Sequence, residues 1–248
     1  MEKLFAEALI VLGNAFRRLE RQVPLPMPQK WGDGYVFRCR EKDVYQAIVQ
    51  KMARLVSGLH AIFCLHRHGF LQEQGVIQRT VDELVEDIFF LIGAIHQKKL
   101  QPLHEDFLAN FFAEEFDSEK PRVVLPKPPQ VVRKKIRAYI VRTLNPQANP
   151  SKALDVHSIV ANAYSGYVHA VSPHIMDMYA PDQQRFLVQG MLGTPRMEDH
   201  KDDAWNYYLR GMFAVQAASK AFGDASLVDA LGEYIFKFEK ESKPLRQP

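Results

Sequence analysis

The chain has few cysteines, only Cys39 and Cys64 among its 248 residues. Two thiols cannot build the disulfide framework that holds many small secreted domains together. The cysteine content therefore favours a reducing compartment, and we expect the protein to be cytoplasmic. The net charge is also small, at +3, which is too weak to indicate a nucleic-acid-binding protein by itself.

Several motifs of catalytic and cofactor-binding proteins are missing. The sequence contains no GxGxxG or phosphate-loop glycine pattern, no HExxH, no CxxC and no GxSxG. It also lacks the paired Glu-x-x-His motifs that a di-iron helical bundle needs. His60, His66 and His68 are spaced so that they do not share one helical face. We therefore expect no cofactor and no bound metal.

No uninterrupted apolar run is long enough to cross a bilayer. The most apolar stretch, residues 88–95, is far shorter than the roughly 20 residues of a transmembrane helix. Residues 1–22 lack the basic start and the small-residue cleavage site of a secretory signal. We expect no association with a membrane.

Apolar residues recur at helical spacing along most of the chain, which predicts a single all-α, bundle-like domain of about seven to nine helices over residues 1–248. We expect loops at 23–40 and 119–130 and a flexible tail at 243–248. Residues 35–39 alternate as a short strand does, but they have no evident partner, so we assign them to the first loop. The predicted helical segments are residues 2–22, 41–68, 71–98, 103–116, 131–144, 154–179, 182–192, 202–222 and 226–241.

The stretch 154–179 carries a polar stripe within an apolar helix. Ser158, Asn162, Ser165 and His169 are spaced so that they return to one face. If that face is buried, the Ser165 hydroxyl meets the imidazole of His169 one turn away and fixes its orientation. Ser172 before Pro173 predicts the N-cap of a second helix. The stripe is either a site or a set of satisfied hydrogen bonds between helices.

A second candidate group lies in the long helix predicted at 71–98. Arg79 and Glu83 stand one turn apart in this otherwise apolar helix, with Asp82, Glu86 and Asp87 nearby. If Arg79 and Glu83 point inward, they form a charge-assisted pair that faces another helix. If they point outward, they are a surface ion pair of small energy. The spacing permits both orientations.

Residues 120–152 carry positive charge only. This segment holds nine basic residues and no acidic one, directly after a predicted helix whose charges are all acidic. Such clustering either creates a positive surface that attracts the phosphates of RNA, or neutralises the acidic helix before it. The basic residues are Lys120, Arg122, Lys127, Arg133, Lys134, Lys135, Arg137, Arg142 and Lys152.

The elements Arg79-Thr-Val-Asp-Glu83 and Ser165-Gly-Tyr-Val-His169 resemble the hallmarks of a group of bacterial all-helical proteins, over about residues 53–179. The arrangement is also similar to the HEPN superfamily, whose members include ribonucleases of toxin and phage-defence systems. The usual HEPN site is an arginine followed closely by a histidine, often completed across a homodimer. Arg54 and His60 fit that spacing, whereas Asn162 stands where an arginine would precede His169.

The resemblance implies an RNA-binding or metal-independent RNA-cleaving protein. Such cleavage needs a base for the ribose 2′-hydroxyl and a cation for the developing phosphorane charge. We expect His169 to act as the base, Arg79 as the cation and Glu83 as the group that orients it, with Ser165 and Asn162 beside them. The alternative is a non-catalytic scaffold that binds a protein partner or a second copy, in which Arg79, Glu83, Ser165 and His169 form a buried network.

Overall fold

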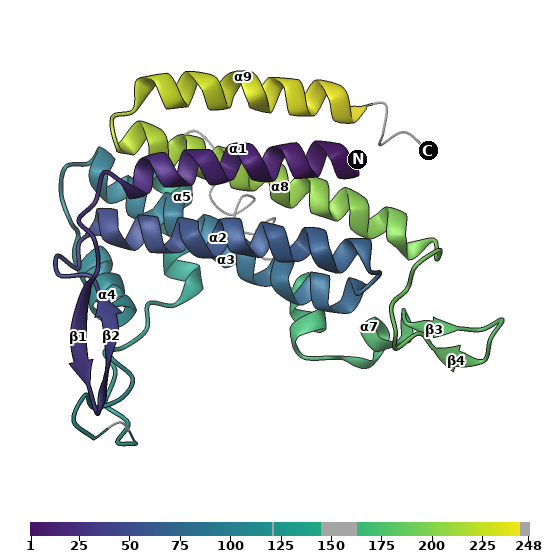
Figure 1. Ribbon diagram of the computed structural model, residues 1–248, viewed down its shortest axis with the longest axis horizontal. Coiled ribbons are helices and arrows are strands. Elements are labelled where there is room, and N and C mark those ends of the chain that lie inside the picture. Colours follow the sequence, from purple (N-terminus) through teal and green to yellow (C-terminus); the bar gives the residue numbers. More distant parts are fainter. Residues whose placement is uncertain (121, 145–162, 244–248) are drawn as a thin grey trace.

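The computed structural model describes residues 1–120, 122–144 and 163–243, and it confirms the all-α fold class (Figure 1). The helices are α1 (Glu2–Glu20), α2 (Val44–Arg67), α3 (Leu71–His96), α4 (Pro102–Phe111), α5 (Arg133–Leu144), α7 (Ser172–Met176), α8 (Arg196–Ala221) and α9 (Ala225–Ser242). Residues 163–168 are also helical.

The core forms around α2 and α3, which run beside each other as a helical hairpin (Figure 1). The tight link between them needs Gly69, whose φ of 74° is unfavourable for other residues. A Cβ at Gly69 would also lie 2.7 Å from the backbone nitrogen of Met191. α8 packs against both helices of the hairpin, α1 packs against α2 and α8, and α9 packs against α8 and α1. The amphipathic stripe of α1 explains its place, because Leu12 and Leu19 are fully buried there.

The expectation of a loop over 23–40 is wrong for most of that segment. Strand β1 (Met27–Trp31) pairs antiparallel with β2 (Gly34–Arg38), so the alternating residues 35–39 have a partner after all. Pro28 is compatible with this pairing, because both strands of a two-stranded ribbon are edge strands that tolerate a missing N–H. The ribbon extends away from the helices (Figure 1).

Three predicted helices differ from the structure. Residues 182–192 form a turn and strand β4 (Arg185–Phe186), which pairs with β3 (Tyr179–Ala180), rather than a helix. α4 ends at Phe111 instead of reaching residue 116, and α8 begins at Arg196 rather than at residue 202. Charged residues fill the first turn of α8, so the apolar pattern starts later than the helix does.

The helix start predicted at Ser172 is displaced by one residue. Val171 is the N-cap of α7, and its side chain makes no capping hydrogen bond. Ser172 is the first helical residue, and Pro173 follows it within the first turn, where its missing N–H costs nothing.

α2 is long and apolar enough to cross a membrane by length and composition, and it is the one helix with this property among the described residues. The helices that bury the core of globular proteins pass the same test. Here α2 contacts α1, α3 and α8, and Ile48, Met52 and Leu55 are fully buried between them.

Candidate functional site

The clearest polar site is a charged seam along α3. Its carboxylates form two adjacent stripes, one with Glu83 and Asp87 and one with Asp82 and Glu86, each one helical turn apart. Cations reach these stripes from other helices. We call this set the α3 seam: Arg79, Asp82, Glu83, Glu86, Asp87, Lys51, Arg133, Arg137 and Arg210.

Arg79 and Glu83 form the pair that their spacing predicted, with 2.7 Å between Arg79 Nη2 and Glu83 Oε1. The pair is neither fully inward nor a free surface pair, since the Arg79 side chain is 19% exposed and that of Glu83 is 35% exposed. Glu83 also lies 3.4 Å from Arg133 Nη2 of α5. The charge of Glu83 is therefore shared between two guanidinium groups.

Asp87 is the most enclosed carboxylate of the seam, with a side chain that is 1% exposed. Lys51 of α2 approaches it to 2.7 Å and Arg133 of α5 to 2.5 Å. The carboxylate thus connects α2, α3 and α5. A buried charge of this kind is stable only when its partners remain in place.

The second stripe pairs in the same way. Arg137 Nε of α5 donates to Glu86 Oε1 at 2.8 Å, and Arg210 of α8 forms an ion pair with Asp82. Burial raises the pKa of Glu86, and the hydrogen bond from Arg137 opposes that rise only in part.

The basic segment forms more ion pairs with α3 than with the acidic helix that precedes it. Arg133 and Arg137 are bound by carboxylates of α3, and Lys127 pairs with Glu115 just beyond α4. Lys134, Lys135 and Arg142 are exposed and make no ion pair with any described residue. Lys152 lies outside the described residues. Neutralisation therefore accounts for part of the positive charge, and Lys134, Lys135 and Arg142 face solvent.

None of these ion pairs involves Ser165 or His169. Residues 163–168 turn Tyr164 and Tyr167 toward the core, where Tyr164 contacts the ring of Tyr207 at 5.4 Å between centroids. His169 follows Tyr167 by two residues, which is about 200° around a helix, and it is exposed. Within the polar stripe, Ser165 is thus partly buried and His169 faces solvent. Asn162 and Ser158 lie outside the described residues.

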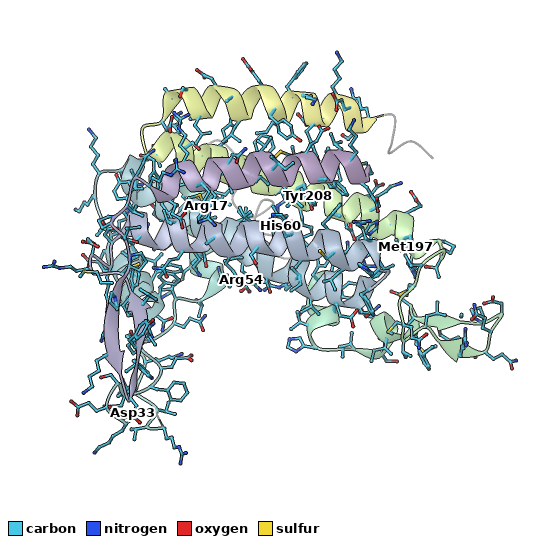
Figure 2. All side chains as sticks on the ribbon, viewed as in Figure 1. Arg17, Asp33, Arg54, His60, Met197 and Tyr208 are labelled. Atoms are coloured by element: carbon cyan, nitrogen blue, oxygen red, sulfur yellow. The ribbon has the colours of Figure 1, made fainter. Side chains whose placement is uncertain are left out.

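Ser165 and His169 are joined by their backbones, through a bond of 3.1 Å from His169 N to Ser165 O. Across residues 1–120, 122–144 and 163–243, no hydrogen bond or ion pair connects Arg79 or Glu83 with either residue. Arg54 and His60 are both exposed on α2 (Figure 2). Their spacing rotates them about 120° apart around the helix, so they do not share a face.

The structure brings histidines together around Tyr167, which the sequence pattern did not predict. The Tyr167 ring contacts those of His174 and His200, with centroids 4.4 and 5.7 Å away. His66 Nδ1 lies 3.2 Å from Gln74 Oε1, and the amide nitrogen of Gln74 donates to the His200 carbonyl at 2.8 Å. We call the three histidines, together with Tyr167 and Gln74, the histidine cluster. The sequence did not indicate this cluster because residue 200 lies before the predicted start of the helix that carries it.

Burial is the main cause of the pKa shifts of His66 and His200. Burial, with a smaller contribution from nearby His66, lowers the pKa of His200 from 6.5 to about 4. It also lowers the pKa of His66, against a hydrogen bond with Gln74 that acts in the opposite direction. Both imidazoles are therefore held neutral. No group of three or more His, Cys, Asp or Glu side chains within the described part of the chain is placed to hold a metal ion.

Comparison with known proteins identifies no related protein. No family model, no curated protein and no solved structure matches the chain.

Proposed function

We propose that the protein is a non-catalytic helical scaffold that binds another protein chain. The α3 seam supports a structural role for Arg79 and Glu83, because their charges are shared with Arg133 and connect helices. The free thiols of Cys39 and Cys64 favour a cytoplasmic location for such a scaffold.

The observation that carries the proposal is the exposed apolar surface of two hairpins that extend beyond the helices (Figure 1). We call residues 27–38 the first arm and residues 179–186 the second arm. On the first arm, Tyr35 and Phe37 are 68% and 60% exposed, and their rings meet edge to face at 5.7 Å. On the second arm, Tyr179 and Phe186 form a similar exposed pair at 5.3 Å. Exposed apolar patches commonly mark protein interaction sites.

The first arm is also held firmly enough to serve as an interface. Arg38 Nε donates to Glu114 Oε1 at 2.5 Å, and its guanidinium lies over the Trp31 ring at 5.4 Å. At the tip, Gly32 N donates to Ser118 O at 2.8 Å. These contacts fix the backbone while Tyr35 and Phe37 remain exposed. A preordered apolar surface loses little conformational entropy when a partner covers it.

The first partner to test is a second copy of the chain. Light scattering during gel filtration, over a range of concentrations, would compare the wild type with the double variant Tyr35→Ser, Phe37→Ser. We expect association in the wild type and its loss in the variant, with an unchanged melting temperature. Phe236→Ser is the matched control, because Phe236 is an equally exposed aromatic residue on α9, outside both arms.

A monomeric wild type at every concentration would rule out self-association. Crosslinking from a photoreactive residue placed at position 35 would then search for a different protein chain. The scaffold proposal fails if neither experiment finds a partner, or if Phe236→Ser changes the mass as much as the double variant does.

RNA binding or metal-independent RNA cleavage, as in a HEPN-like defence or toxin protein, is the second candidate. One observation favours it: His169 is accessible to solvent, and Lys134, Lys135 and Arg142 leave positive charge exposed on α5. RNA degradation without metal should then be lost in His169→Ala, while the variant melts like the wild type. An inactive wild type would remove this candidate.

A further inference from the structure

A pocket of about 600 Å³ lies beside the α3 seam, between four helices. α5 packs against α3 and α9 packs against α8, and the pocket is lined by residues of all four. Its volume falls in the range of roughly 300–1,000 Å³ that is usual for small-molecule sites. The apolar part of its wall consists of Val85, Phe89, Ile140, Phe213, Ala217 and Val228.

The polar groups of the pocket differ in whether the protein already pairs them. Glu86 is bound by Arg137, and Arg210 forms an ion pair with Asp82, so each of these charges is balanced by protein. Gln216 donates its amide to the Val228 carbonyl at 3.0 Å. Lys220, in the last turn of α8, is exposed and forms no ion pair with a described residue. Among the described residues that line the pocket, only Lys220 carries a charge that no other described residue balances, and that charge is positive.

An apolar pocket with one unpaired cation in its described lining matches a molecule with an apolar body and one anionic group. We propose that this pocket binds an amphipathic carboxylate, with the hydrocarbon part among Phe89, Ile140 and Phe213 and the carboxylate at Lys220. Burial of the hydrocarbon supplies most of the affinity, and Lys220 selects the charge. This inference does not depend on the scaffold function, because neither arm contributes to the pocket.

Isothermal titration calorimetry of the full chain with laurate tests the proposal. Dodecyltrimethylammonium is the matched ligand control, since it has a similar chain and the opposite charge. We expect saturable laurate binding and no comparable binding of the cation. The titrations would stay below the micelle-forming concentration of each ligand, so that detergent-like unfolding does not imitate binding.

Two kinds of variant then locate the site. Ala217→Phe fills the pocket from α8 and should abolish binding, and Val228→Phe fills it from α9 if the first variant does not fold. Lys220→Gln should weaken laurate binding about tenfold, since it removes one charge-assisted contact. Lys240→Gln, on the exposed side of α9, should leave binding unchanged.

Three results would overturn the proposal. One is the absence of laurate binding to the wild type. Another is equal binding of laurate and the cationic control, which would make the interaction nonspecific adsorption. The last is a folded Ala217→Phe or Val228→Phe variant that binds laurate as the wild type does, because the ligand would then lie elsewhere. Failure of the self-association experiment would affect none of these results.

Discussion

At the residue scale, Gly75 shows how a side chain far along the chain can determine what a helix position tolerates. A Cβ at Gly75 would lie 2.6 Å from Cγ of Tyr167, within the histidine cluster. In the sequence, Gly75 is an isolated glycine near the start of a helix, with no sign of such a contact. The reason for the glycine therefore lies in tertiary packing and not in helix propensity.

We expect Gly75→Ala to lower the free energy of unfolding by about 1–3 kcal/mol, because the added methyl group displaces the Tyr167 ring. Gly13→Ala is the matched control, since a Cβ there meets no atom within 4 Å. At that open position of α1, the same change should stabilise the protein by about 0.5–1 kcal/mol through helix propensity. Urea unfolding of both variants measures the difference. Shifts of the same sign would contradict this account.

At the element scale, the apolar arc of residues 71–98 predicted a central helix, and α3 confirms it by packing against α2, α5 and α8. The spacing of Arg79 and Glu83 likewise predicted their pairing, because residues four apart share a helix face. Neither pattern identified Arg133 as the shared partner. Arg133 is 50 positions from Glu83, and periodicity carries no information over that separation.

The ion pairs of α3 predict a strong effect of removing one buried charge. Asp87→Asn would leave Lys51 and Arg133 facing an uncharged group, and we expect a loss of about 3 kcal/mol in the free energy of unfolding. Glu20→Gln removes the carboxylate of an exposed pair with Arg17 and should cost less than about 0.5 kcal/mol. Thermal and urea unfolding would compare the two. Similar small losses would mean that the seam contributes little to stability.

At the scale of the whole molecule, the histidine cluster links stability to pH. His200 has a pKa of about 4 in the folded chain and an ordinary value of 6.5 when unfolded. Between these values the unfolded state binds more protons, so the free energy of unfolding falls as the pH decreases from about 6.5 to about 4. Below that window both states are protonated, and this contribution falls no further.

We expect the loss from His200 to reach about 3 kcal/mol across the window. His200→Leu should flatten the pH dependence without abolishing it, because the pKa of His66 is lowered as well. His169→Ala is the control, since His169 is exposed and lies outside the cluster. Urea unfolding at a series of pH values would measure the slopes. A slope in His200→Leu equal to that of the wild type would show that another group titrates.

The sequence by itself determined the helical class, most helix positions and the Arg79–Glu83 pair, because each follows from residues within a few helical turns. Only the tertiary structure decided that Tyr164 and Tyr167 pack toward the core while His169 faces solvent. It also decided that part of the basic segment neutralises α3, and that residues 27–38 pair as strands. These outcomes depend on which distant surfaces meet, and the partner of a side chain is set by packing of the whole chain.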